Sequence, residues 1–303
     1  MNYISEMKKK QIKFNRINEQ TAEYIMKNEY SFFQLMEYSQ IFDQYISTEK
    51  KGQFIRLEFA HIYYLAIIDE QLRHLILHQC LELEKYLKLQ ITNYFNRRNE
   101  LISAILQDYM IQDMEYLSET YKESKNDIIH EKYTNLKIEE LNLIQFLNVI
   151  QFGTLERFWL FCYDKCIAPS SEKLNALRDC FLSTRRLRNA SAHNNTILSN
   201  LREKAMAEQN YTSSQHVSNY LKQSGIGQKT LATNMSKKIV RDFCNFLYLC
   251  RETESSAILQ KNYECWNDFF NDTYHNYADI FKPNELLRSV YHFIQKVQLL
   301  LLH

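Results

Sequence analysis

The sequence predicts an all-α fold, and three observations support this prediction. The 303 residues include only four glycines and two prolines. Hairpins and sheets need these residues in their turns, so their scarcity argues against a β fold. Long segments rich in Leu, Ile, Glu, Lys and Gln fill the chain, and these residues favour helix. Tyrosine and phenylalanine are abundant, with 21 and 18 copies, and we expect their rings to fill the core between helices.

The first half of the chain predicts one long helix with shorter helices before and after it. We expect two short helices within residues 1–48, the second of which contains an aromatic-rich stretch. A polar break follows at residues 47–52. Residues 54–96 are the longest stretch with apolar side chains at helical spacing. A further helix is predicted over residues 100–121.

The second half predicts helices separated by weak breaks. Residues 138–166 predict a helix interrupted at Gly153, because glycine bends a helix or lets two backbones approach closely. Pro169 and Ser170 give a clear break and a helix start. Residues 200–238 are polar and predict a loop or a pair of short, loosely held helices. Strongly apolar or aromatic helical segments follow at residues 240–249, 266–277 and 285–302.

We therefore expect four segments. They are an N-terminal helical segment (1–53), a helical bundle (54–200), a polar loop or short helices (201–238), and a C-terminal helical segment that packs on the bundle (239–303).

The segment 184–195, Thr-Arg-Arg-Leu-Arg-Asn-Ala-Ser-Ala-His-Asn-Asn, is the most unusual in the chain. It places three arginines before a histidine, and no acidic residue occurs between Asp179 and Glu203. The bare spacing of Arg188 and His193 is weak, because an arginine followed five residues later by histidine also occurs at residues 56–61 and 73–78.

The helical geometry of this segment leaves two arrangements open. Asn189 and His193 share one helix face, which Arg185 extends by one turn, whereas Arg188 lies about 140° away from His193. One continuous helix therefore does not aim Arg188 and His193 at one atom. Either the helix begins near Ser183 or Thr184, with its positive end beside the arginines, or two copies of the motif form the site.

The chemistry that these residues could support is cleavage of RNA without a metal. A base takes the proton of a ribose 2′-hydroxyl, which attacks the adjacent phosphorus, and an acid protonates the departing 5′-oxygen. Histidine suits both proton transfers near neutral pH, and arginine stabilises the added charge on the phosphoryl oxygens. The competing interpretation is a solvated helix face or a capped helix end.

The charge pattern favours a local basic patch over a general nucleic-acid coat. The net charge is +1, so the chain as a whole is nearly neutral. Basic clusters outside the 184–195 segment occur at residues 8–10, 97–98 and 237–238, where a solvated surface is the simpler interpretation.

We expect no metal, no cofactor and no membrane span. Seven scattered cysteines, Cys162 and Cys166 included, suggest free thiols in a reducing cytoplasm, and residues 1–11 lack the apolar core of a signal peptide. Glu70, His74, His78 and Glu82 recur every four residues, but such a row is more often a solvated or paired helix face than a metal site. The longest uninterrupted apolar runs are too short to cross a bilayer.

Four ordered elements of the chain resemble the abortive-infection (Abi-like) family of bacterial phage-defence proteins, within the RNA-cleaving HEPN superfamily. They are the aromatic stretch 30–38, Asp69-Glu70-Gln71-Leu72-Arg73 with the downstream Leu83-Glu84-Lys85, Phe152-Gly153-Thr154-Leu155, and Leu187 to Asn194. Lys88 stands where the family often has an arginine, so the second element is an imperfect match. We expect Arg73 and Glu84 to form ion pairs between helices.

The resemblance implies a HEPN-type helical bundle with additional N- and C-terminal helices, and a metal-independent endoribonuclease toxin of abortive infection. Arg188, Asn189 and His193 would be catalytic, with Asn189 orienting His193 or holding the phosphate. Arg185, Arg186 and Asn194 would contact RNA. The resemblance further implies a homodimer with a composite site, products with a 2′,3′-cyclic phosphate and a 5′-hydroxyl, and a small structured non-coding RNA as a bound partner or inhibitor. The alternatives are a non-catalytic RNA-binding module and a scaffold.

Overall fold

The computed structural model describes residues 2–46, 49–95, 104–113, 115, 117, 136–203 and 213–303 of the chain. Regular structure in these residues is helical, apart from two isolated β-bridges that join Lys13 with Glu58 and Gln44 with Phe54. The predicted all-α fold is therefore confirmed. The helix predicted over residues 100–121 is present at residues 104–113, and its remaining part lies largely outside the described residues.

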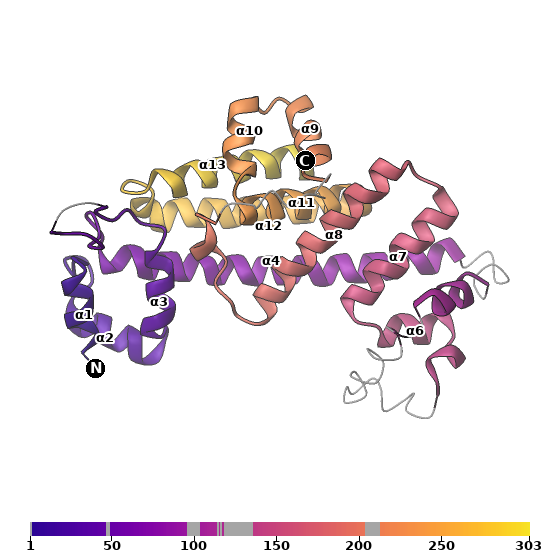
Figure 1. The fold of residues 1–303 in the computed structure, drawn as a ribbon, viewed down its shortest axis with the longest axis horizontal. Helices are drawn as coiled ribbons and strands as arrows, with labels where there is room; N and C mark the ends of the chain where they lie inside the picture. Colours follow the sequence, from indigo (N-terminus) through magenta and orange to yellow (C-terminus); the bar gives the residue numbers. More distant parts are fainter. Residues whose placement is uncertain are drawn as a thin grey trace.

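One long helix, α4 (Phe59–Phe95), is the central element of the molecule and runs across most of its width in Figure 1. Its 37 residues span about 55 Å at the rise of an α-helix. Apolar side chains along its length, from Phe59 through Leu72 and Leu83 to Phe95, are buried against helices on several sides. The prediction for residues 54–96 is confirmed, except that the helix begins five residues later because residues 54 and 58 pair with other segments.

Three short helices cover the N-terminal end of α4, where two were predicted. They are α1 (Tyr3–Lys9), α2 (Glu19–Asn28) and α3 (Phe32–Ser39). Each begins at a residue whose side-chain oxygen accepts a backbone N–H of the first turn, namely Asn2, Asn18 and Ser31. The aromatic stretch that was predicted as part of the second helix spans the turn between α2 and α3 and continues into α3.

At the other end of α4 lie the 3₁₀-helix η3 (Ile138–Glu140), α6 (Leu143–Val149) and α7 (Phe152–Ile167). The helix predicted over residues 138–166 is interrupted as expected, but the interruption comes just before Gly153, which lies in the first turn of α7. The break comes at Ile150 and Gln151, whose extended backbones separate the two helices.

The helix α8 (Ser171–Ala192) lies across α4, and a layer of C-terminal helices packs against both (Figure 1). This layer consists of α11 (Lys238–Thr253), α12 (Ser256–Tyr277) and α13 (Glu285–Leu302), with the short η5 (Ala278–Ile280) before α13. Nearly all of α11 is buried between α8 and α13. The motif helix is thus held from two sides.

The polar segment after α8 forms short helices. Its elements are η4 (Leu198–Asn200), α9 (Ser213–Gln223) and α10 (Gln228–Met235), with residues 204–212 outside the described part. Val217, Leu221 and Leu231 are buried, so α9 and α10 pack firmly on the C-terminal layer.

All seven cysteines have free thiols, and five of them are buried. Burial raises the pKa of several of these thiols, Cys162 among them, so they behave as small core residues. Across the described ranges, none of the helices has the length and apolar character needed to span a lipid bilayer.

Candidate functional site

The Arg-Asn-x-x-x-His segment forms the C-terminal end of α8. The helix begins at Ser171, where the Ser170 hydroxyl accepts the Lys173 N–H at 3.3 Å, as the sequence predicted. A helix start near Ser183 or Thr184 is therefore wrong. Both side chains are buried within the helix, and the Thr184 hydroxyl donates to the Cys180 carbonyl. The arginines consequently lie toward the negative end of the helix dipole, which favours cations and gives no help to a bound phosphate.

The helix ends in a turn that fixes the backbone of His193. His193 is the C-cap, and Asn194 follows with a left-handed φ of 57°. The Asn195 N–H donates to the Ala190 carbonyl at 2.9 Å and the Asn194 N–H to the Ser191 carbonyl at 3.2 Å, the pattern of a Schellman motif. Asn194, predicted as an RNA contact, thus also has a structural role, because asparagine tolerates the left-handed conformation that ends the helix.

The two central residues of the predicted site differ in exposure. His193 and Asn189 are exposed, whereas Arg188 is half-buried. Burial raises the pKa of the Cys80 thiol on α4, and the positive charge of Arg188 opposes this shift, so the guanidinium lies near the middle of α4. Arg188 lies in α8 and His193 caps it, so helical geometry predicts an angle of about 140° between them. This angle disfavours an arrangement in which one chain directs Arg188 and His193 at a single atom.

Asn189 contacts Arg188. Its side-chain oxygen accepts the Arg188 Nη1–H at 3.3 Å, and its backbone carbonyl accepts the His193 N–H at 3.0 Å. The contact therefore favours a role for Asn189 in orienting the guanidinium, while a role in orienting the imidazole stays a prediction.

The other two arginines lie beside acidic side chains of neighbouring helices. Arg185 Nη1 is 3.7 Å from a carboxylate oxygen of Glu156 on α7, and Arg186 Nη1 is 3.8 Å from one of Asp242 on α11. Burial raises the pKa of the Glu156 carboxyl to about 7, and the charge of Arg185 opposes this shift. About a third of each arginine side chain remains exposed, so either can still reach a phosphate.

An open cleft of about 680 Å³ lies beside α8 on the Arg185 side. Side chains of α7 and α8 line it, among them Glu156, Arg157, Arg178 and Arg185. Its lining is mixed in charge, and Arg185 joins it to the motif helix.

A buried polar cluster fixes α8 on α11. The Ser183 hydroxyl donates to Asp242 at 2.8 Å and accepts the Asn245 side-chain N–H at 3.0 Å. All three residues are buried, so α8 has one rotational setting against α11, and that setting fixes where Arg186 and Arg188 point.

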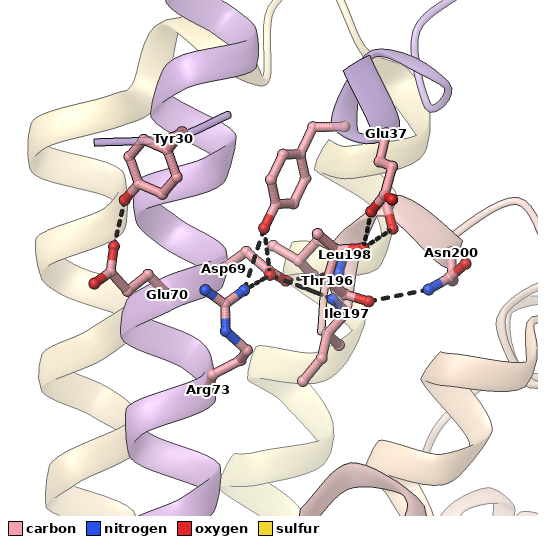
Figure 2. A network of polar contacts seen from close by, with 11 residues as sticks. Tyr30, Glu37, Asp69, Glu70, Arg73, Thr196, Ile197, Leu198 and Asn200 are labelled. Carbon is pink, nitrogen blue, oxygen red and sulfur yellow. Dashed lines mark hydrogen bonds and ion pairs between the residues drawn. The ribbon is translucent and has the colours of Figure 1, made fainter. Parts of the chain in front are cut away.

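Figure 2 shows a second network, in which Asp69 of α4 holds the segment that follows the motif. The fully buried Asp69 carboxylate accepts the backbone N–H groups of Ile197 and Leu198 at 3.1 and 2.7 Å. It also accepts the Tyr38 hydroxyl at 2.6 Å and forms an ion pair with Arg73. Burial raises the pKa of the Asp69 carboxyl, and the hydrogen bond from Tyr38 and the charge of Arg73 oppose this.

The expected ion pairs between helices at Arg73 and Glu84 are wrong. Arg73 pairs with Asp69 and Glu84 with Lys88, each within α4 and four residues apart, so the partners lie on one helix face. The signature element that contains Asp69 and Arg73 thus supports the loop after His193.

The polar row of α4 does not gather into a metal site. Glu70 accepts a hydrogen bond from the Tyr30 hydroxyl, and His74 and His78 are exposed. In the described ranges of the chain, no three His, Cys, Asp or Glu side chains come close enough to hold a metal ion.

Of the other basic clusters, the one at residues 237–238 lies near the motif helix, because the charges of both Lys238 and Arg186 act on the Asp242 carboxyl. Lys8 pairs with Glu19 in the N-terminal segment, and Lys238 pairs with Glu203. The cluster at residues 97–98 lies outside the described residues.

The chain matches the family described as Abi-like protein over residues 26–199, more than half of its length. It belongs to this family. The match begins in α2, ends in η4 and includes both the motif helix and the Asp69 network. No curated protein and no solved structure is significantly similar to the chain.

Sequence reasoning missed the part of the Abi-like site that long-range packing creates. Asp69 and Arg73 stood out as a signature, but nothing in the sequence places Asp69 next to Ile197, 128 residues away. Tyr38 belongs to the aromatic stretch found in the sequence, and its hydroxyl donates a hydrogen bond to the Asp69 carboxylate. Burial and the nearby Asp69 raise the pKa of Tyr38, which keeps the phenol protonated as a donor.

Proposed function

We propose that this Abi-like protein is a metal-independent endoribonuclease toxin of anti-phage abortive infection. The observation that carries the proposal is the end of α8, where an exposed histidine follows a half-buried arginine on a rigidly held helix. Family membership supports the role in phage defence. The small structured RNA expected from the resemblance would bind as a partner or inhibitor.

The side chains have distinct tasks in the proposed reaction. His193 takes or returns a proton at the 2′-oxygen or the 5′-oxygen of the scissile phosphodiester, for which its exposure at the helix end gives access. Arg188, with Asn189 on its guanidinium, stabilises the charge on the phosphoryl oxygens. The 2′-oxygen bonds to phosphorus and the P–O5′ bond breaks, which leaves a 2′,3′-cyclic phosphate and a 5′-hydroxyl.

A second copy of the chain completes the site in this proposal. In ideal helical geometry, Arg188 in α8 and the C-cap residue His193 differ by about 140° in direction and about 7.5 Å along the axis, so one copy would serve a single phosphate poorly. Two helix ends facing each other would supply two imidazoles and two guanidinium groups around one RNA strand. The rate of cleavage should then fall more steeply than the protein concentration on dilution.

Purified full-length protein tests the proposal. Wild type should cleave RNA in the presence of a chelator, whereas His193→Ala should lose about 10²–10⁴-fold in rate because a proton-transfer group is gone. RNA affinity of that variant should stay nearly unchanged. His292→Ala, which removes an exposed histidine of α13, is the matched control. Full chelator sensitivity, or equal activity of wild type and His193→Ala, would refute the proposal.

The competing function is a non-catalytic RNA-binding module. It is favoured by one observation, the three arginines on a single helix with about a third of Arg185 and Arg186 exposed. Binding through phosphates alone falls steeply with salt and does not depend on one imidazole. RNA binding without any His193-dependent cleavage would support this function.

A further inference from the structure

The segment from His193 to Leu198 is held at two points. On the helix side, the Schellman turn fixes Asn194 and Asn195. On the far side, Asp69 holds the N–H groups of Ile197 and Leu198. Thr196 lies between these points, and its hydroxyl donates to Glu37 of α3 at 2.7 Å. The backbone next to the exposed imidazole therefore has little freedom.

The Asp69 carboxylate is organised for this task. It lies on the long helix α4, and four donors surround it: two backbone N–H groups, the Tyr38 hydroxyl and the Arg73 guanidinium (Figure 2). Arg73 is 2 % exposed and also donates to the Tyr38 oxygen at 3.2 Å. A buried carboxylate with four donors around it strongly favours one geometry of the loop that it holds.

A role in stability alone explains the Asp69 network less well than a role in positioning the loop after His193. The core of α4 is already packed by apolar side chains along its length, and a buried ion pair adds little net stability over an apolar pair. What the carboxylate adds is a directional anchor for two successive N–H groups, four and five residues after His193.

We propose that Asp69 is a positioning residue that acts on His193 through the segment 194–198. The proposal rests on the proposed ribonuclease function, because it concerns the residue expected to transfer protons there. Asp69 does not touch the RNA. Asp69 fixes the backbone of residues 194–198, and this backbone determines the position of the His193 imidazole relative to Arg188.

The test uses full-length Asp69→Asn, which keeps the side-chain size and one carbonyl oxygen but loses the charge and brings an N–H₂ group against the N–H groups of the loop. The rate constant kcat for RNA cleavage should fall about 10–100-fold while KM stays within about twofold, since misplacement costs rate more than binding. Val297→Ala, a core truncation in α13 far along the chain from the loop, is the control for lost stability. It should leave both constants unchanged at a temperature where the protein is folded.

A second readout does not depend on cleavage. The ring resonances of His193, assigned by comparison with His193→Ala, should shift or broaden in Asp69→Asn and stay in place in Val297→Ala. If Asp69→Asn does not fold, Tyr38→Phe removes one donor and should give a smaller change in the same direction, about a few-fold in kcat.

The outcomes separate the two proposals. Inactive wild type would refute the ribonuclease function, while the ring resonances would still decide whether Asp69 fixes His193. Active wild type with unchanged His193 resonances in Asp69→Asn, or an equal loss of kcat in Asp69→Asn and Val297→Ala, would overturn the positioning role.

Discussion

The buried carboxyl of Glu254 gives a stability prediction that can be worked through with its sign. Glu254 is the C-cap of α11, is 8 % exposed, and accepts the Asn262 side-chain N–H at 2.7 Å. Burial raises the pKa of this carboxyl from 4.5 to about 7, and the hydrogen bond from Asn262 opposes the shift. The perturbation is Glu254→Gln, which keeps the carbonyl oxygen for Asn262 and cannot ionise.

The magnitude follows from the proton that the folded state keeps and the unfolded state releases. Between pH 4.5 and 7, the unfolded chain loses this proton while the folded chain retains it, so the folded state of wild type becomes less stable as the pH rises. With the two pKa values above, the change from pH 5 to pH 8 is about 2.5 kcal/mol. Glu254→Gln lacks this pH-dependent loss of stability. The free energy of unfolding of the variant minus that of wild type should therefore be about 2.5 kcal/mol larger at pH 8 than at pH 5.

Denaturant unfolding of both proteins at pH 5, 6, 7 and 8 measures this difference. A fixed cost of burying the new amide group shifts the variant equally at every pH and does not alter the comparison. Glu264→Gln, on an exposed position of α12, controls for the loss of one negative charge and should run parallel to wild type. Parallel curves for wild type and Glu254→Gln would refute the reasoning.

Two further changes test the elements that hold the motif helix. Asn194→Gly should keep stability within about 0.5 kcal/mol, because glycine accepts φ of 57°, whereas Asn194→Val should lose about 1–2 kcal/mol in denaturant unfolding. If the Asn194 amide contacts RNA, the glycine variant should also bind RNA more weakly, and equal stability of the two variants would contradict the Schellman turn. Ser183→Ala should destabilise by about 1–3 kcal/mol, since buried Asp242 and Asn245 each lose a partner. Its control, Ser236→Ala at an exposed position, should stay within about 0.5 kcal/mol of wild type, and equal losses in both would contradict the cluster's role.

The sequence predicts the helices well wherever local chemistry decides them. Ser170 and Pro169 mark the start of α8, and the spacing of apolar residues marks α4. The break between α6 and α7 was predicted at Gly153 but lies at Ile150 and Gln151, which are neither glycine nor proline and so gave no local signal for its position.

The same limit applies to the site. Arg188 and His193 could be found from composition and resemblance, because the segment has an unusual charge pattern. The end of the helix at His193 carried a signal in Asn194, which favours the left-handed conformation. The support from Asp69 could not be found, because it depends on the tertiary approach of α4 to residues 197 and 198.

The proposed cleavage of RNA at the end of α8 depends on His193. The most direct measurement is expression of wild type and His193→Ala in cells, followed by mapping of RNA 5′ ends. We expect new 5′-hydroxyl ends, paired with 2′,3′-cyclic phosphates, to accumulate with wild type and to be lost with His193→Ala. The same ends at the same abundance with both proteins would contradict the claim.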